Sequence, residues 1–210
     1  MLDYRLDAET EALRKTVREF AMEVVAPQIG EFYERDEFPT AIVRQMGELG
    51  LFGLPFPEEY GGSGGDYFAL CIALEELARV DSSVAITLEA AISLGAMPIY
   101  RFGTEEQRQT WLPPLVSGEA LAAFGLTEPG FGSDAGGAQT RAVLDVDADE
   151  WVINGSKAFI TNSGTDITSV VAVAAASEPV PGSVSPNAAS ASPPVSRGSQ
   201  VAFCSGVPKR

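Results

Sequence analysis

The sequence contains no histidine, and this absence excludes whole classes of mechanism. A Ser-His-Asp triad would lack its general base, and metal sites that rely on imidazole would lack their ligands. We therefore expect no metal centre. Basic residues are also scarce, because 14 Lys and Arg stand against 29 Asp and Glu, which gives a formal charge of −15. Binding to nucleic acids needs a basic surface, so we expect no nucleic acid partner.

Cysteines and long apolar runs are rare as well. The chain has only Cys71 and Cys204, and Cys71 lies in an apolar helical run, which predicts a small core residue. Such sparse cysteine use favours a reduced, cytoplasmic protein. The first residues lack the basic and apolar regions of a signal peptide. The most apolar stretch, residues 82–100, is interrupted by Glu89, serines and Pro98, so we expect no membrane insertion.

The first 117 residues have a helical period. Residues 8–26 place apolar side chains at alternating +4 and +3 steps, on one helix face, and Pro27 and Gly30 are expected to end this helix. The same reasoning predicts further helices at about 40–49, 67–80, 82–100 and 105–112. The helix at 67–80 has apolar residue types on nearly all sides, which indicates a central position in a bundle. Residues 1–117 are therefore predicted to form an α-helical domain.

From Leu121 the period changes to that of strands. The candidate strands are residues 121–127, 140–146, 151–153, 157–161 and 169–174. The pair Asn154-Gly155 between two β-prone runs predicts a hairpin, and residues 147–150 predict a polar turn between the two preceding strands. We therefore expect an α+β protein in which residues 118–176 form an incomplete antiparallel barrel or sandwich.

The end of the chain differs from both of these regions. Residues 177–210 contain eight Ser, six Pro and three Gly, which make up half of the segment, and they show no apolar period. This composition predicts a disordered tail. Our hypothesis for the abrupt change is a shift of reading frame near Ala176 or a truncation of the gene.

One stretch combines small residues, free backbone amides and hydroxyl groups. Residues 123–134 (AFGLTEPGFGSD) begin as a strand-like run, break at Pro129 and continue through two glycines. Such a turn can hold a polar, anionic cofactor, and a glycine-rich surface turn is the alternative. Part of the stretch fits the dinucleotide fingerprint G-x-G-x-x-A. The following residues, 136–146, lack the helical stripe that this fingerprint requires, so we reject a Rossmann fold.

A second motif follows at residues 151–162 (WVINGSKAFITN). Together the two stretches resemble the acyl-CoA dehydrogenase family, in which a TEP-x-x-GSD segment precedes an NG-x-K-x-(aromatic)-IT-N segment. Residues 57–62, 74–78 and 102–107 are similar to that family too, so the resemblance covers residues 1 to about 176. It implies FAD as the cofactor, an acyl-CoA thioester as the substrate and an electron-transfer flavoprotein as a partner. Intact members of the family are homo-oligomers.

The resemblance also implies which residues bind the flavin: Phe124, Leu126, Thr127, Gly132, Ser133, Phe159, Ile160 and Thr161. The Thr161 hydroxyl is expected near flavin N5, and Ser133 is also expected to meet the thioester arm of CoA. For Phe124, Leu126 and Ile160 a simple core position is the alternative, because alternate strand positions face inward. Phe131 departs from the family, which usually has a small residue between the two glycines.

By resemblance, the reaction is the oxidation of an acyl-CoA to the trans-2-enoyl-CoA, in which a carboxylate removes the α-proton and the β-hydride passes to the flavin. The family's carboxylate lies in a C-terminal domain that this sequence does not contain. We therefore assign no catalytic residue, and expect Glu128 to bind nearby amides instead. This chain alone is expected to be inactive. The alternatives are a non-catalytic remnant or interaction module, and a related acyl-CoA oxidase or flavin monooxygenase of the same fold.

Overall fold

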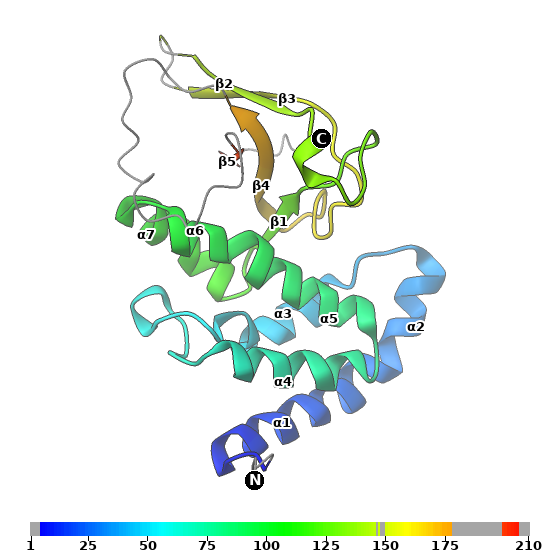
Figure 1. Ribbon diagram of the computed structural model, residues 1–210. Helices are drawn as coiled ribbons and strands as arrows, with labels where there is room; N and C mark the ends of the chain where they lie inside the picture. The colour runs from blue at the N-terminus through cyan, green and yellow to red at the C-terminus, as the bar shows by residue number, and fades with distance from the viewer. Residues whose placement is uncertain (1–4, 146, 148–149, 178–198, 206–210) are drawn as a thin grey trace.

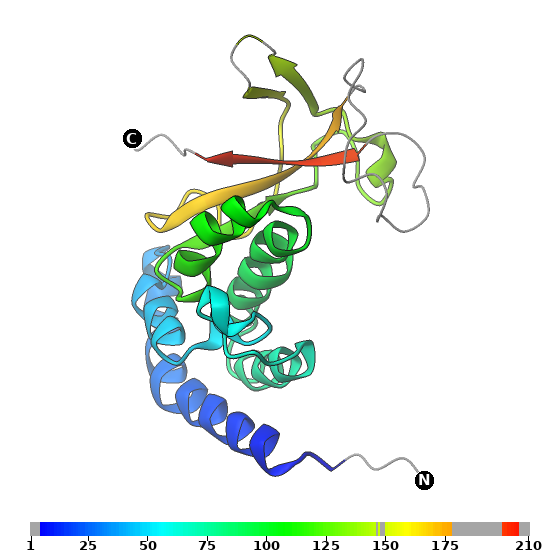
Figure 2. The same cartoon turned by 90° about the vertical axis from the view of Figure 1, so that its left-hand side faces the viewer.

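The computed structural model describes residues 5–145, 147, 150–177 and 199–205. Helices from the first half of the chain pack together in one region, and the strands form a sheet on one side of them (Figure 1). A view turned by 90° shows the sheet above the green helices of the first region (Figure 2). The α+β class is therefore confirmed.

The helical region is built from long α-helices with short 3-10 and π-helical segments between them. In chain order they are α1 (Ala8–Phe20), η1 (Ala21–Val25), α2 (Ala26–Arg35), α3 (Thr40–Glu48), η2 (Leu51–Gly53), η3 (Glu58–Tyr60), α4 (Tyr67–Ala78), α5 (Ser82–Glu89), η4 (Ala90–Ala96), α6 (Met97–Phe102) and α7 (Glu105–Val116). Their inward faces form the main core. Its largest fully buried side chains include Phe52, Phe56, Ile42, Met46, Leu77 and Leu88.

The first helical run is longer than the sequence pattern predicts. α1 continues through the π-helical turn η1 into α2, and the run ends at Asp36, which has a left-handed conformation with φ 54°. The prediction that Pro27 and Gly30 end the helix is therefore wrong. Pro27 lies in the first turn of α2, directly after η1.

α4 is less buried than we expected. It begins as predicted, with the Asp66 carboxylate accepting a hydrogen bond from the N–H of Ala69 at 3.0 Å. α4 packs between α1 and α5, which covers side chains such as Leu70 and Leu77. Its outer face remains open, since Phe68 is 52% exposed and Cys71 is exposed as well. The predicted central position is confirmed, since α4 lies between two helices, but its outer face is open, and the prediction of a core Cys71 is wrong.

The long apolar run, Ser82–Phe102, forms a continuous helical segment made of α5, η4 and α6. Among the described residues it alone is long and apolar enough to cross a membrane by composition, and 61% of its apolar window is buried inside the fold. Gly95 of η4 lies directly against the sheet. A Cβ placed on Gly95 would come within 2.3 Å of the Ala122 Cβ. The helical region and the sheet therefore meet at very short range.

α7 begins with a capping box. The Thr104 hydroxyl accepts from the N–H of Gln107, and the Gln107 side chain accepts from the N–H of Thr104. The helix then continues to Val116, so the expected stop at Pro113 is wrong. The last turn is held to the core by Leu112 and Leu115, which are buried, and this packing outweighs the hydrogen bonds that prolines remove.

The sheet is centred on its longest strand. The strands are β1 (Leu121–Gly125), β2 (Arg141–Asp145), β3 (Glu150–Asn154), β4 (Thr168–Ser177) and β5 (Ser199–Ser205). β1 and β2 pair with β4 in parallel, β5 pairs with β4 antiparallel, and β2 and β3 form an antiparallel hairpin. The sheet is mixed, which corrects the expectation of an antiparallel barrel or sandwich. The loop at 155–167 carries the chain from β3 past β2, so that β4 lies between β1 and β2.

Residues 157–161 are not a strand. This corrects the prediction of a strand there and the prediction of a hairpin at Asn154-Gly155. Asn154 ends β3, and the following residues do not turn into a hairpin partner. Phe159 has φ 57° and Asn162 has φ 66°, so the backbone leaves the extended conformation there. The hairpin that forms joins β2 and β3 through the polar turn predicted at 147–150, of which residues 148 and 149 lie outside the described residues.

β5 lies within the segment that we expected to be disordered. Its backbone pairs with β4 from Ser199 opposite Ala176 to Ser205 opposite Val170. The expectation therefore does not hold for Ser199–Ser205. The average composition of the tail conceals this short run, which contains β-prone residue types and no proline or glycine. For residues 178–198 and 206–210, which lie outside the described residues, disorder stays a prediction.

Candidate functional site

A cavity of about 210 Å³ lies where η4, the end of β1 and the loop after β3 meet. The residues that line it are Ala90, Leu94, Phe124, Leu126, Thr127, Phe159, Ile160 and Thr161. Apolar side chains form most of the wall, and two threonines add hydroxyl groups. Its volume lies below the ~300–1,000 Å³ that is usual for ligand pockets. The cavity is therefore smaller than a usual ligand pocket.

The cavity gathers six of the eight residues that the sequence motifs predict as flavin contacts. They come from two separate segments, 124–127 at the end of β1 and 159–161 before β4. Gly132 and Ser133 are not in its wall, because they lie exposed in the loop between β1 and β2. Nothing lies within 4 Å of a Cβ placed on Gly132. This loop therefore leaves open space that a ligand larger than the cavity could occupy.

Phe159 is the most unusual side chain of the wall. It is 94% exposed, although phenylalanine is normally buried, and its backbone has a left-handed conformation with φ 57°. Leu126, across the cavity, is 38% exposed. Strained conformations persist where the surrounding structure imposes them, and they cluster at ligand sites. The exposure and the strain together indicate that Phe159 is held ready for an apolar ligand surface.

Two residues of the wall were not found by sequence reasoning. Ala90 and Leu94 belong to η4, whose π-helical hydrogen bonding widens the helix next to β1. π-helical turns inside α-helices are frequent at functional sites. The sequence pattern at 82–100 predicted one regular helix, and no residue type in it marks the change of hydrogen bonding.

Asn162, which the second motif includes but to which we assigned no role, anchors the loop behind the cavity. Its side chain is buried, and its Nδ2 group donates to the Thr87 carbonyl at 3.0 Å and to the Ala122 carbonyl at 3.4 Å. Thr168 Oγ1 in turn donates to the Asn162 carbonyl. One amide therefore connects α5, β1 and the segment that carries Phe159, Ile160 and Thr161.

An ion pair joins the two segments of the wall. Lys157 Nζ donates to Glu128 Oε1 at 2.8 Å and to the Leu126 carbonyl at 2.9 Å. The Glu128 carboxylate also accepts from the backbone N–H groups of Gln139 at 2.8 Å and Thr140 at 2.9 Å, which confirms the expectation that it binds nearby amides. The Lys157 ammonium, with the hydrogen bonds of Thr140 and Gln139, lowers the pKa of Glu128 to about 2.

Among the described residues, the cavity wall includes no carboxylate, amine or thiol. Apolar and aromatic side chains can contact a flat ring, and the Thr127 and Thr161 hydroxyls can donate or accept hydrogen bonds. This wall alone can bind and orient a ligand. It cannot remove a proton from carbon, because that step needs a general base within hydrogen-bonding reach.

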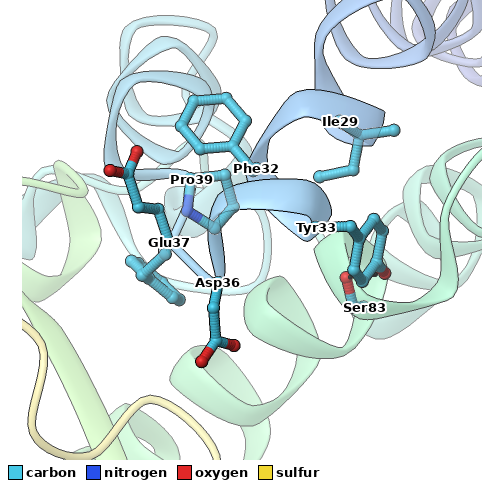
Figure 3. A pocket seen from close by; sticks show the side chains of 8 residues that line it. Ile29, Phe32, Tyr33, Asp36, Glu37, Pro39 and Ser83 are labelled. Atoms are coloured by element: carbon cyan, nitrogen blue, oxygen red, sulfur yellow. Dashed lines mark hydrogen bonds between the residues drawn. The ribbon is translucent and has the colours of Figure 1, made fainter.

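A second cavity, of about 300 Å³, lies in the helical region between α2, the loop after it and the start of α5 (Figure 3). Tyr33, on its wall, donates a hydrogen bond to Asp81 Oδ2 at 2.9 Å and lies 2.8 Å from Ser83 Oγ. The side chains of Asp36 and Glu37 point apart in Figure 3. No group of three potential metal ligands exists among the described residues. This cavity therefore offers no converging set of reactive groups.

Known protein families match almost all of the helical region and much of the sheet. The family described as "Acyl-CoA dehydrogenase, N-terminal domain" matches residues 7–119, and "Acyl-CoA dehydrogenase, middle domain" matches residues 123–190. A probable acyl-CoA dehydrogenase of Bacillus subtilis is 49% identical over 170 residues, which cover 81% of this chain and 44% of that protein. The chain spans less than half the length of the curated relatives it matches.

Solved structures give the same result. Butyryl-CoA dehydrogenase from Megasphaera elsdenii matches with a TM-score of 0.78 and 40% identity, covering 85% of this chain and 46% of that one. An acyl-CoA dehydrogenase from Bacillus anthracis, in complex with FAD, matches with a TM-score of 0.77 and 40% identity, covering 84% of this chain and 31% of that one.

Proposed function

Because the chain belongs to the acyl-CoA dehydrogenase family, we propose that it binds FAD at the cavity beside η4 and forms one wall of an acyl-CoA desaturation site. The observation that carries the proposal is the convergence of six motif residues from two separate segments on one cavity. The alternatives were a surface turn and an ordinary core position. Neither accounts for exposed apolar side chains gathered beside two hydroxyl groups.

The residues present fit a flavin. The isoalloxazine ring is flat and largely apolar with polar edges, and the cavity offers Phe124, Ile160 and the exposed Phe159 beside two threonine hydroxyls. The open loop around Gly132 and Ser133 has free backbone amides and hydroxyl groups for more distant, anionic parts of the cofactor. When bound, FAD would supply the hydride acceptor that the side chains of this chain cannot provide.

We infer further that the substrate is an acyl-CoA thioester, and that electrons leave through an electron-transfer flavoprotein in a reduced, cytoplasmic compartment. The general base must come from outside the cavity wall described above, because no carboxylate lies in that wall. That same observation favours a second candidate, in which this chain binds FAD without catalysing a reaction.

Titration of the purified chain with FAD tests the proposal through quenching of flavin fluorescence. We expect saturable quenching, weakened at least about tenfold by Phe159→Ala and by Thr161→Val, which remove an aromatic contact and a hydroxyl. Phe102→Ala is the matched control, because Phe102 is 65% exposed on α6 and does not line the cavity. Equal FAD affinity in the Phe102 and Phe159 variants, or no binding by the unaltered chain, would reject the proposed site.

A further inference from the structure

We propose that Glu128 and Lys157 are positioning residues, whose ion pair sets the spacing between the two segments of the cavity wall and thereby the affinity for the flavin. The inference rests on the proposed function, and it concerns two residues to which we had assigned no part in cofactor binding. Neither side chain lines the cavity, so we assign them an effect on the position of its walls rather than a direct contact with the flavin.

The ion pair sits at the junction of the two segments. Glu128 directly follows Thr127, and Lys157 lies two residues before Phe159. The Lys157 ammonium donates to the Leu126 carbonyl at 2.9 Å, and the N–H of Ala158 donates to the Thr127 carbonyl at 2.9 Å. Every one of these hydrogen bonds joins the first segment to the second. Loss of the lysine side chain would leave the Ala158–Thr127 bond without the ion pair that supports it.

Glu128 also fixes the loop that carries the remaining motif residues. Its carboxylate accepts from the N–H groups of Gln139 and Thr140, eleven and twelve positions further along the chain. These bonds close the segment that includes Gly132 and Ser133. One carboxylate therefore controls both the spacing of the cavity wall and the ends of the open loop beside it.

The surroundings favour this pair over a flexible surface contact. The side chain of Glu128 is 5% exposed and that of Lys157 is 11% exposed. A charge held at such low exposure needs its partner, since an unpaired one is costly. Gly125 leaves room for the aliphatic part of the Lys157 side chain. A Cβ at position 125 would lie only 3.1 Å from Lys157 Cγ, which is closer than normal contact. The Phe131 ring lies 5.8 Å from the ammonium on another side.

The contacts of the ion pair are local to the cavity wall and the loop, and they do not hold the sheet as a whole. Its other hydrogen bonds go to Leu126, Gln139 and Thr140, and among the described residues none of these bonds reaches β4, the central strand. A break in the pair should therefore loosen the two wall segments and the loop while the backbone pairing of β1 with β4 persists.

Amide hydrogen exchange on the full chain tests the inference without any flavin. In Lys157→Met we expect the amides of Gln139 and Ala158 to exchange at least about tenfold faster, because Gln139 donates to the Glu128 carboxylate itself and the Ala158 bond to Thr127 loses the support of the ion pair beside it. The Ala172 amide in β4 should keep its rate. Lys15→Met is the matched control, since Lys15 is exposed and pairs only loosely with Glu19 at 3.8 Å. Lys157→Arg retains the charge and should restore most of the protection.

A flavin titration of the same variants completes the test. Lys157→Met and the nearly isosteric Glu128→Gln should each raise the FAD dissociation constant about tenfold or more, and Lys157→Arg should raise it less. Unchanged exchange at Gln139 and Ala158 overturns the inference, and so does equal acceleration at Ala172, which would mean a general loss of stability. If the unaltered chain binds no FAD, the proposed function fails, while the exchange rates still decide whether the pair positions the two segments.

Discussion

Glu76 of α4 and Arg18 of α1, 58 positions apart, form a two-pronged ion pair. The Arg18 guanidinium donates to the two oxygens of the Glu76 carboxylate at 2.8 Å and 2.9 Å. Arg14, one turn earlier on α1, donates to the same carboxylate at 2.9 Å. Glu76 is only 1% exposed, whereas the arginine side chains remain 30% and 44% exposed. A single buried carboxylate thus attaches the first helix to the bundle.

We predict that Glu76→Gln destabilises the helical region. The variant leaves two arginines facing a neutral amide, but both remain partly hydrated, so the cost should be about 2–3 kcal/mol, near the lower end for a broken buried pair. Urea unfolding followed by far-UV circular dichroism measures it. Glu19→Gln, which alters an exposed pair on α1, should change the free energy of unfolding by less than about 1 kcal/mol. Equal effects of the two substitutions would contradict the prediction.

The same carboxylate makes stability depend on pH in the acidic range. The Arg18 hydrogen bonds, followed by those of Arg14, lower the pKa of Glu76 from 4.5 to about 2 against the opposing effect of burial. A carboxyl group whose pKa is lower in the folded state contributes stability above the unfolded pKa and loses it as pH falls through the folded value. We therefore expect the free energy of unfolding to fall between pH 4.5 and 2, and to fall less steeply in Glu76→Gln. Parallel pH profiles for the two proteins would refute this assignment.

Two glycine-to-alanine substitutions test the close approach of η4 to the sheet. Gly95→Ala should destabilise the chain by roughly 1–3 kcal/mol, because its Cβ would overlap Ala122, including backbone atoms that cannot move freely. Gly30→Ala is the control, since nothing lies within 4 Å of a Cβ there and α2 is helical. It should stabilise by about 0.5–1 kcal/mol. Thermal unfolding of both variants measures the contrast, and a neutral Gly95→Ala would mean that η4 and β1 are not in contact.

These contacts show where sequence reasoning succeeds and where it stops. Asp66 and Asp81 cap helices as their positions indicate, because a cap depends on residues three apart in the chain. The motifs, which are local as well, contain six residues that the structure brings to one cavity, and their contact with a flavin stays a prediction. The mixed sheet, the exposed Cys71 and the π-helical hydrogen bonding of η4 were missed. Each of these depends on contacts between distant segments, which override local propensity.

Phe159 illustrates the same limit within one motif. The residue types at 157–161 favour a strand, and the sequence pattern therefore predicted one. In the structure the ends of this segment are fixed by long-range bonds, with Lys157 held by Glu128 and Asn162 held by Thr87 and Ala122. Between these fixed ends Phe159 has a left-handed backbone, and its aromatic ring is exposed. Such bonds leave no periodic signal in a single sequence.

Asn162→Ala tests the anchor behind the cavity. The substitution removes both hydrogen bonds that the amide donates to buried carbonyls, which should cost about 1–3 kcal/mol. Asn162→Asp should cost at least as much, because a carboxylate would face the same carbonyl oxygens. Asn154→Ala, at an exposed position at the end of β3, should have little effect. Chemical denaturation of the three variants compares their free energies of unfolding. An Asn162→Ala variant as stable as Asn154→Ala would show that the Asn162 side chain does not stabilise the fold.

The last prediction is that this chain binds FAD but does not reduce it with an acyl-CoA. No carboxylate lines the cavity, so the substrate's α-proton has no acceptor in the wall that the structure describes. General-base catalysis typically contributes ~10²–10⁴-fold, and its loss alone makes the reaction slow. The cavity of about 210 Å³ is also too small to enclose a flavin and a thioester together, so water would reach both.

Anaerobic mixing of the FAD-saturated chain with acyl-CoAs of several lengths, followed at the absorption band of oxidised flavin, measures this directly. Binding is established first by fluorescence, so that an absent reduction reflects absent proton removal rather than absent cofactor. Rapid bleaching that depends on chain length, with formation of the enoyl-CoA, would show that a base acts after all. Glu128 would not be the first candidate, because the Lys157 ammonium and two backbone N–H groups hold its carboxylate in a buried network. Asp134, exposed in the loop beside the cavity, would be the first residue to change, and Asp134→Asn would then abolish the bleaching.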